Sequence, residues 1–388
     1  MARSTEIERK LDRYVGIALV GLAGAFHRRR QLPAMPRRIG ILQPTAIGDL
    51  ILNTGLLAHL RHCFPQAELH VFHGPTNTQA VALLPLAVTN HCCNFKDIHQ
   101  IVTTLRLNRL DILIDCTSWS RLMSLVCHLS GAKTTVGFLS PGQHRHFCFD
   151  IAVPYSGKHH EVENLRALAG VFGPIETYVP TVRQPDQPPP MELPYPRLVL
   201  MHVAPGGSRA RQKSWPTANW ANLARNLVER GWVVAFSGVD RDQDTIAAVL
   251  AAANLPESHC FSLAGRLSLA ELAYALIRIK IFITVDTGVS HLATALNCNV
   301  IGLHGPTRFN RWGAIGSNAT GLDAPHPDAG YINHGYERHA RGDEIMASLS
   351  LDTVLRTVLE RLGSCPADTS LPAPESNSAN GGSTFDAS

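Results

Sequence analysis

The sequence predicts an α/β protein made of two Rossmann-like domains with parallel sheets. Apolar segments of strand length alternate with helical patterns, which is typical of parallel sheets. This alternation runs twice, before and after residues 183–197, which hold six prolines in fifteen residues. The length of 388 residues suits two domains with additional segments at the ends.

The first domain is predicted over residues 37–182. Strands are expected where short apolar runs lie between turn residues, and helices where apolar residues recur at helical spacing. The predicted strands are 38–43, 68–72, 111–115 and 134–138, the last of which closes the series. The predicted helices are 49–64, 97–108 and 162–172.

The second domain is predicted over residues 198–363, after a semi-rigid, extended linker at 183–197. Its predicted strands are 198–203, 232–236, 281–285 and 300–304, and its predicted helices are 219–230, 268–279, 289–296 and 352–362. The tail at 364–388 is small, polar and rich in Pro and Gly, and we expect it to be disordered.

Composition excludes several classes of protein. Apolar residues make up 45% of the chain and charged residues 17%, which is ordinary for a globular protein. Nine scattered cysteines without CxxC spacing disfavour a disulfide framework or a structural zinc site and suit a reducing compartment. No run of basic residues is interleaved with aromatic residues, so we expect no nucleic-acid partner.

Residues 1–36 form a basic and apolar N-terminal arm. Residues 1–38 carry nine Lys or Arg and three acids, a net charge of +6, so the remaining chain sums to −2. The uncharged segment 14–26 lies between cations and is too short to span a bilayer. An interfacial membrane helix is the first interpretation, with Ile7, Leu11, Tyr14, Ala18, Leu22 and Ala25 as its apolar stripe. A helix packed on the protein itself and a cleaved signal peptide are the alternatives.

Ligands of open parallel sheets bind at the carboxyl ends of the strands, so the loops that follow the strands are the candidate sites. After the first strand, residues 43–50 (QPTAIGDL) form a small-residue turn before Asp49. Asp49 is either a first-turn acid that stabilises the helix or a carboxylate able to accept a proton in the cleft. Neither GxGxxG nor GxxxxGK[ST] is present there.

The loop after 198–203 reads APGGSRARQKSWP. Its Gly-Gly-Ser turn exposes backbone N–H groups, and Arg209, Arg211 and Lys213 follow. Such a loop can hold a phosphate group, which its cations neutralise. A solvated basic loop is the alternative.

The strand 281–285 ends at Asp286, and Thr287-Gly288 then turns the chain into a helix. The helix start presents free N–H groups to an anion, and Asp286 can accept bonds from sugar hydroxyls. His291 lies one turn further along and is either part of this site or a structural residue.

The loop after 232–236 reads SGVDRDQD, in which Asp240 and Asp242 could hold a cation or, at the strand end, a ribose hydroxyl. Acids collected at the first turn of a helix are the alternative. The clustered histidines lack HExxH or CxxC spacing, so no metal site is assigned.

Together these motifs resemble glycosyltransferase family 9, the ADP-heptose:lipopolysaccharide heptosyltransferases. The resemblance extends from about residue 38 to 362 and rests on residues 38–71, APGGSRARQKSWP, AGRLSLAEL and VDTGVSHLATALNCNVIGLHGPT. It implies a GT-B architecture, with two Rossmann-like domains facing each other across a cleft. It also implies an inverting, metal-independent reaction. In this reaction a sugar, expected to be heptose, is transferred from an ADP-sugar to a lipopolysaccharide or related glycan.

The resemblance implies a role for each matching residue. Asp49 corresponds to the catalytic base and Lys213 to the lysine that contacts the diphosphate. Compared with the family the loop is one residue longer than usual, so Arg211 is a candidate to share the role of Lys213. Arg209 is a further candidate, and Gly305 and Thr307 come from the Gly-Pro-Thr motif. The expected donor-binding residues are Gly207, Ser208, Asp240, Asp286, Thr287, Gly288 and His291.

The expected partners are the nucleotide-sugar donor, a lipid-linked glycan acceptor and, through the arm, the cytoplasmic leaflet of the membrane. No cofactor is expected besides the donor substrate, and the location is cytoplasmic or peripheral on the inner face of the membrane. Two alternatives are the same fold using another nucleotide sugar and a non-catalytic nucleotide-binding module tethered to membrane.

Overall fold

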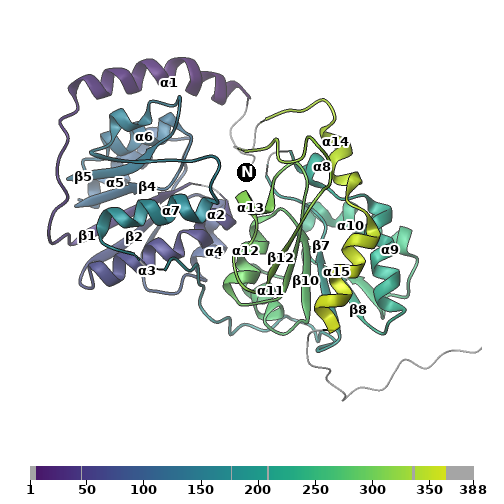
Figure 1. The fold of residues 1–388 in the computed structure, drawn as a ribbon. Coiled ribbons are helices and arrows are strands. Elements are labelled where there is room, and N and C mark those ends of the chain that lie inside the picture. Colours follow the sequence, from purple (N-terminus) through teal and green to yellow (C-terminus); the bar gives the residue numbers. More distant parts are fainter. Residues whose placement is uncertain (1–5, 45, 176, 208, 334–336, 364–388) are drawn as a thin grey trace, which may run out of the picture.

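The computed structural model describes residues 6–44, 46–175, 177–207, 209–333 and 337–363. Two six-stranded parallel sheets, each with helices around it, lie side by side (Figure 1). Their strand orders are β3-β2-β1-β4-β5-β6 and β12-β11-β10-β7-β8-β9. Counted within its own half, each sheet has the 3-2-1-4-5-6 order of the Rossmann fold, and the predicted fold class is therefore confirmed.

The first sheet and its helices hold residues 38–172. Its strands are β1 (Arg38–Gln43), β2 (Glu68–His73), β3 (Thr89–Cys92), β4 (Ile112–Asp115), β5 (Thr134–Leu139) and β6 (Ile151–Pro154). Its helices are α2 (Ile47–Leu52), α3 (Thr54–Cys63), α4 (Thr78–Val81), α5 (Ile98–Leu107), α6 (Arg121–Leu129) and α7 (Glu161–Ala169), with short 3-10 turns that include η2 (Arg145–Cys148).

The second sheet follows the linker. Its strands are β7 (Leu198–His202), β8 (Val233–Phe236), β9 (Cys260–Ser262), β10 (Ile281–Val285), β11 (Val300–His304) and β12 (Ala319–Asp323). Its helices are α8 (Ala210–Lys213), α9 (Thr217–Val228), α10 (Gln243–Ala253), α11 (Leu269–Leu276), α12 (Gly288–Ala295), α13 (Phe309–Trp312), α14 (Gly342–Ile345) and α15 (Leu351–Gly363).

The central strands were predictable because they are apolar on both faces, as a sheet covered by helices on both sides requires. All four residues of β4 and all five of β7, β10 and β11 are buried. The sequence did not indicate the edge strands β3, β6, β9 and β12. These strands are short, and most of their residues are exposed or only partly buried, so they lack a continuous apolar run. The strands of the first domain therefore end at β6 and not at the predicted strand 134–138. The single helix predicted over 49–64 is in fact two helices, α2 and α3, which meet at Asn53.

The N-terminal arm forms α1 (Glu6–Phe26), which lies across α6 and η2 on the outside of the first domain (Figure 1). Small residues allow this close packing: a Cβ on Gly16 would lie 3.1 Å from Arg121 Cδ, and one on Gly24 would lie 2.6 Å from Phe147 Cβ. Val20, on the same face, is fully buried. One face of α1 therefore packs on the protein itself, as one of the three interpretations expected, while large apolar side chains on its other face stay exposed.

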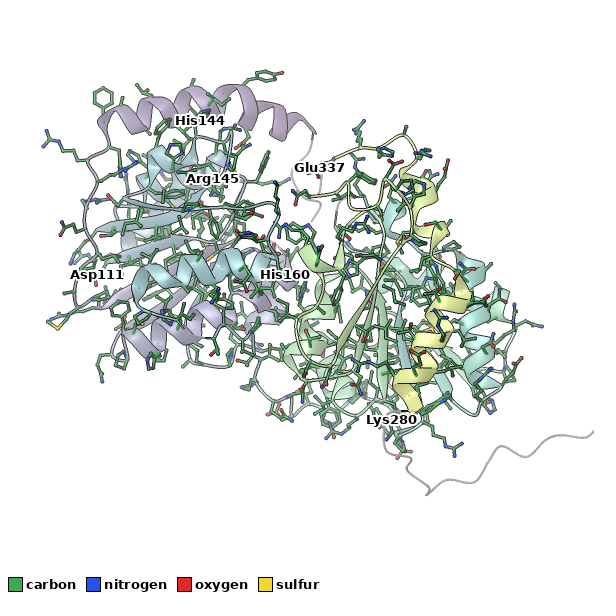
Figure 2. The ribbon with its side chains drawn as sticks, in the orientation of Figure 1. Asp111, His144, Arg145, His160, Lys280 and Glu337 are labelled. Carbon is green, nitrogen blue, oxygen red and sulfur yellow. The ribbon has the colours of Figure 1, made fainter. Side chains whose placement is uncertain are left out.

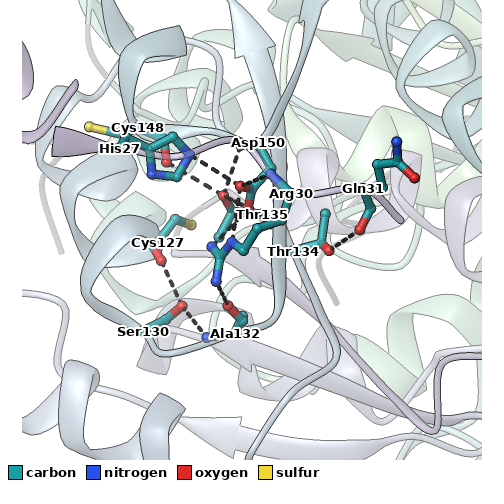
Figure 3. A network of polar contacts seen from close by, with 10 residues as sticks. All are labelled: His27, Arg30, Gln31, Cys127, Ser130, Ala132, Thr134, Thr135, Cys148 and Asp150. Atoms are coloured by element: carbon teal, nitrogen blue, oxygen red, sulfur yellow. Dashed lines mark hydrogen bonds and ion pairs between the residues drawn. The ribbon is translucent and has the colours of Figure 1, made fainter. Parts of the chain in front are cut away.

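Polar contacts hold the arm at both ends of α1. Arg121 Nη1 lies 3.3 Å from Asp12 Oδ2 at the start of the helix. After its end, the guanidinium of Arg30 binds both carboxylate oxygens of Asp150, at 3.1 and 2.9 Å, and the carbonyl of Ala132 at 2.9 Å (Figure 3). The Asp150 side chain is fully buried, so losing Arg30 would leave its charge without its main partner.

No helix within the described ranges is long and apolar enough to cross a membrane. The prediction of disorder at 364–388 lies outside the described residues.

Candidate functional site

A cavity of about 300 Å³ lies between the two domains at the carboxyl ends of the strands. The strand order reverses between β1 and β4 in one sheet and between β7 and β10 in the other, and loops diverge at such switch points to form a crevice. The loops after β1, β7, β8, β10 and β11 all contribute to the cavity wall, as the sequence analysis expects.

Asp49 lies in the first turn of α2 and lines the cavity from the first domain. The neighbouring Gly48 touches the second domain, because a Cβ there would lie 2.8 Å from His291 Cδ2 and 3.0 Å from Gly288 Cα. A Cβ on Gly288 would in turn lie 2.7 Å from the Gly48 nitrogen. Both glycines are therefore needed for the approach of α2 to α12, which brings Asp49 to the second domain.

A buried polar network supports the loop before Asp49. The amide of Asn53 donates to Gln43 Oε1 at 2.9 Å, and the fully buried Asn77 donates to the Gln43 carbonyl at 3.2 Å. Ala46 has a φ of 72°, a backbone conformation that costs a non-glycine residue energy and is found mainly where the surroundings enforce it. No local pattern in the sequence indicates this network, because its members lie 10 and 34 positions from Gln43.

Lys213 and Asp286 form an ion pair at the opposite wall, with Nζ 2.7 Å from Oδ2. Their side chains are only 11% and 13% exposed. Burial alone would raise the pKa of Asp286, but the Lys213 charge, His304 and hydrogen bonds from Lys213 and Thr307 hold that pKa far below its usual range. Asp286 is therefore a carboxylate at every working pH.

Thr307 also donates its hydroxyl hydrogen to Asp286 Oδ2 at 3.0 Å, which joins the Gly-Pro-Thr motif to the ion pair. Thr287 precedes the first residue of α12, where N–H groups are free for an anion. The second domain thus contributes the Lys213 ammonium group and the backbone N–H donors at Thr287 and Gly288 to the cavity wall. The first domain contributes the Asp49 carboxylate to the same cavity. This combination suits a base facing an anionic leaving group.

Two buried histidines of the cavity wall are held neutral. Burial lowers the pKa of His291 to about 4, despite the nearby Asp286 charge. Burial likewise lowers the pKa of His202 to about 4, and its Nδ1 lies 3.0 Å from the Ser237 hydroxyl.

These shifts predict that the protein loses stability in mild acid. Because both imidazoles take up a proton near pH 6.5 only when the chain unfolds, acid favours the unfolded state. Between pH 7.5 and 5.5 the free energy of unfolding should fall by about 1 kcal/mol for each of the two. Thermal unfolding across this range measures the effect, and a constant melting temperature would contradict it.

The structure places the other predicted residues in different surroundings. Gly207, at φ 78°, lines the cavity, whereas Ser208 lies outside the described residues. Arg211 does not line the cavity with Lys213: it is 82% exposed and pairs with Asp343 on α14 at 2.7 Å. Arg209 donates to the Glu337 carbonyl at 3.2 Å. Gly305 packs against Met346, since a Cβ there would lie 2.6 Å from its sulfur.

Asp240 is also displaced from the predicted site. It is exposed and does not line the cavity; its Oδ1 accepts a weak bond from Gln243 at 3.4 Å. Asp242 lines the cavity instead and accepts the Val239 N–H at 2.9 Å. The 3-10 turn over 240–242 rotates the first acid outward, so Asp242 replaces Asp240 as the acidic candidate on this loop.

The cavity wall contains further residues that the sequence analysis missed, namely Thr76, His202, Arg241, Trp312 and Ile332. His202 follows directly from the strand-end rule, because it is the last residue of β7. In the described part of the chain, no group of three or more His, Cys, Asp or Glu side chains is arranged to hold a metal ion.

Comparisons with known proteins agree with this geometry. The family model described as glycosyltransferase family 9 (heptosyltransferase) matches residues 98–330. A lipopolysaccharide heptosyltransferase 1 of Pseudomonas aeruginosa is 37% identical over 139 residues, which is 34% of this chain and 36% of the relative, so the match spans about a third of that protein.

Two solved structures share the fold. The structure of E. coli ADP-heptose LPS heptosyltransferase II has a TM-score of 0.68 at 19% identity and covers 84% of this chain and 98% of its own. The structure of E. coli heptosyltransferase WaaC with ADP has a TM-score of 0.64 at 17% identity and covers 84% of this chain and 99% of its own. The architecture is accordingly GT-B, and the family model covers more than half of the residues. The chain belongs to glycosyltransferase family 9, the heptosyltransferase family.

Proposed function

We propose that this protein is an inverting glycosyltransferase that moves heptose from ADP-heptose to a lipopolysaccharide or related glycan acceptor. One observation carries the proposal: Asp49 and the Lys213–Asp286 pair line opposite walls of one cavity, each on its own domain. One solved structure of E. coli heptosyltransferase WaaC contains ADP, and another contains ADP-2-deoxy-2-fluoro heptose.

In the proposed reaction Asp49 accepts the proton of the acceptor hydroxyl as that oxygen attacks the anomeric carbon of the donor. The bond from this carbon to the diphosphate breaks, and ADP leaves with the electron pair. Lys213 and the N–H groups at the start of α12 stabilise the negative charge that develops on the diphosphate. Asp286 and Thr307 orient Lys213. Asp242 is the proposed ribose contact.

The proposed reaction uses no metal ion, because Lys213 and backbone donors supply the positive charge at the leaving group. Transfer of sugar from ADP-heptose should therefore continue at its full rate in EDTA. A loss of transfer that Mg²⁺ or Mn²⁺ restores would instead assign a cation to Asp242 and its neighbours.

A ligand screen tests the proposal against its two alternatives. A nucleotide at 100 times its Kd stabilises the folded protein by about 2.7 kcal/mol, so we expect ADP to raise the melting temperature clearly above the values with UDP or GDP. Stronger stabilisation by another nucleotide would favour a transferase for a different sugar donor. Binding of ADP-heptose without transfer to any delipidated glycan would favour the non-catalytic module.

We also propose that the arm binds the cytoplasmic leaflet of the membrane, where a lipid-linked acceptor would be found. Six of the fourteen large apolar side chains that are exposed in the described part of the chain lie on α1. They are Tyr14, Val15, Ile17, Leu19, Leu22 and Phe26, with Phe26 80% exposed. An exposed apolar face next to the exposed Arg28 and Arg29 is typical of a helix in the interface of an anionic membrane.

Substitutions on the outer face of α1 test this without unfolding the arm. Leu22→Asp with Phe26→Asp should release the protein from anionic liposomes, because both side chains point away from the body and would no longer enter the bilayer. Val179→Asp is the matched control, since Val179 is 63% exposed and Leu22 61%. Equal flotation of both variants with anionic liposomes would refute the membrane proposal. The melting temperatures of both variants should equal that of the wild type, which shows that the arm stays folded.

A further inference from the structure

The two domains also touch at a second place, beside the cavity. Arg311 on α13 of the second domain extends into the first domain, where it reaches the loop after β6 and the start of α7. It is only 6% exposed. A guanidinium that crosses a domain boundary and is this deeply buried requires partners on the far side.

The first domain supplies these partners. Arg311 Nη2 lies 2.8 Å from Glu161 Oε2, whose side chain is 9% exposed, and it also donates to the Tyr155 hydroxyl. Arg311 Nε donates to the Gly157 carbonyl at 3.1 Å. Each of these three acceptors would move away from Arg311 if the domains separated.

Glu161 is prepared for this contact by its own domain. Its Oε2 accepts the Tyr155 hydroxyl at 2.8 Å, and the Asn164 amide lies at 3.4 Å. These bonds within the first domain hold the carboxylate in place independently of Arg311. Because both groups are buried at the boundary, removing one partner would leave the other charge buried and unpaired, whereas separation of the domains would return both charges to water.

His160 adds a second bond across the same boundary. Its Nδ1 accepts the Val162 N–H at 3.1 Å, which caps α7, so the proton of the neutral ring lies on Nε2. That nitrogen donates to the Gly313 carbonyl, just after α13, at 2.9 Å. Figure 2 shows His160 at the edge of the first domain that faces the second.

The contact between Arg311 and the first domain is linked to the cavity through Trp312, the residue that follows Arg311. The Arg311 guanidinium lies 3.9 Å from the centre of the Trp312 ring, and Trp312 lines the cavity. The orientation of the domains and the shape of the cavity wall thus depend on the same side chain.

We propose that Arg311 is a positioning residue: its ion pair with Glu161 holds the domains in the closed arrangement that brings Asp49 to the wall formed by Lys213 and Asp286. This inference rests on the proposed function for its effect on catalysis. Exchange of donor and acceptor then requires this pair to open and close again in each turnover.

Glu161→Gln tests the proposal, since it keeps the shape and removes the charge. We expect kcat for sugar transfer to fall about 10- to 100-fold, because a displacement of about 1 Å between reacting groups costs about 10²-fold. The Kd for ADP should stay within about twofold, because the expected ADP contacts lie on the second domain. Small-angle scattering of the ligand-free protein should show a larger radius of gyration for the variant than for the wild type.

Arg311→Gln and the double variant Arg311→Gln with Glu161→Gln complete the test. If the pair acts as a unit, the double variant loses no more activity than either single variant. Arg308→Gln is the control, because Arg308 pairs only loosely, at 3.9 Å, with Asp323 of its own domain. Unchanged scattering and unchanged kcat in a folded Glu161→Gln variant would overturn the proposal.

The scattering measurement needs no substrate, so it also separates this proposal from the proposed function. Absence of transfer in the wild type, together with an expanded Glu161→Gln variant, would refute the reaction and leave the domain contact established. If both single variants fail to fold, thermal unfolding reports this directly, and His160→Leu, which removes the side-chain donor to the Gly313 carbonyl, then serves as the variant for scattering. It should be less compact than the wild type, and unchanged compactness of this folded variant would overturn the proposal.

Discussion

Replacing Asp49 with asparagine is expected to lower the rate of heptose transfer by about 10²–10⁴-fold, the usual contribution of a general base. The amide has nearly the same shape as the carboxylate, so the first turn of α2 and its contact with α12 should persist. The Kd for ADP should stay near the wild-type value, because Asp49 lies on the wall of the first domain, opposite Lys213. Transfer assays and ADP titrations on the same preparation measure both quantities.

Asp97→Asn is a matched control for this experiment. Asp97 caps α5 in the same domain by accepting the Gln100 N–H at 2.9 Å, and asparagine caps helices equally well. Its transfer rate should stay within about twofold of the wild-type rate. Near-normal turnover of Asp49→Asn would remove the base from Asp49 and direct attention to other groups on the first-domain wall.

The architecture was predictable from sequence because the central strands carry a strong local signal. Each is a short run of apolar residues that ends in a polar or glycine-rich turn, and this pattern fixes both the sheet and the edge at which ligands bind. The candidate loops follow from that edge alone. Asp49, Lys213 and Asp286 therefore meet at one cavity although 237 positions separate the first from the last.

The side chain that faces the cavity was harder to predict than the loop that carries it. Asp240 and Asp242 lie two residues apart, yet a single 3-10 turn exposes one and directs the other to the cavity. Lys213 and Arg211 have the same charge, but Asp343, far along the chain, attracts Arg211 away. Contacts between distant segments decide such cases, and the Arg311–Glu161 pair is another that no local pattern indicates.

The second large effect is expected for Lys213→Ala, and it has two parts. ADP should bind about 10- to 100-fold more weakly, because a charge-assisted contact contributes about 1.5–3 kcal/mol. The protein should also lose about 3–5 kcal/mol of stability, because Asp286 would remain buried as a carboxylate without its cation. The ion pair is thus a structural element of the empty site as well as a candidate contact for the diphosphate.

A double variant separates these two parts. Lys213→Met with Asp286→Asn removes both charges, so its melting temperature should recover most of the loss seen in Lys213→Ala, while its affinity for ADP should stay low. Arg166→Ala is the control, because Arg166 and its partner Glu163 are 45% and 48% exposed and form a surface pair worth at most about 1 kcal/mol. If the double variant regains ADP affinity along with stability, Lys213 acts only by compensating Asp286. The diphosphate contact would then have to come from the backbone of the Gly207 turn and the start of α12, whose N–H groups need no cation to bind an anion.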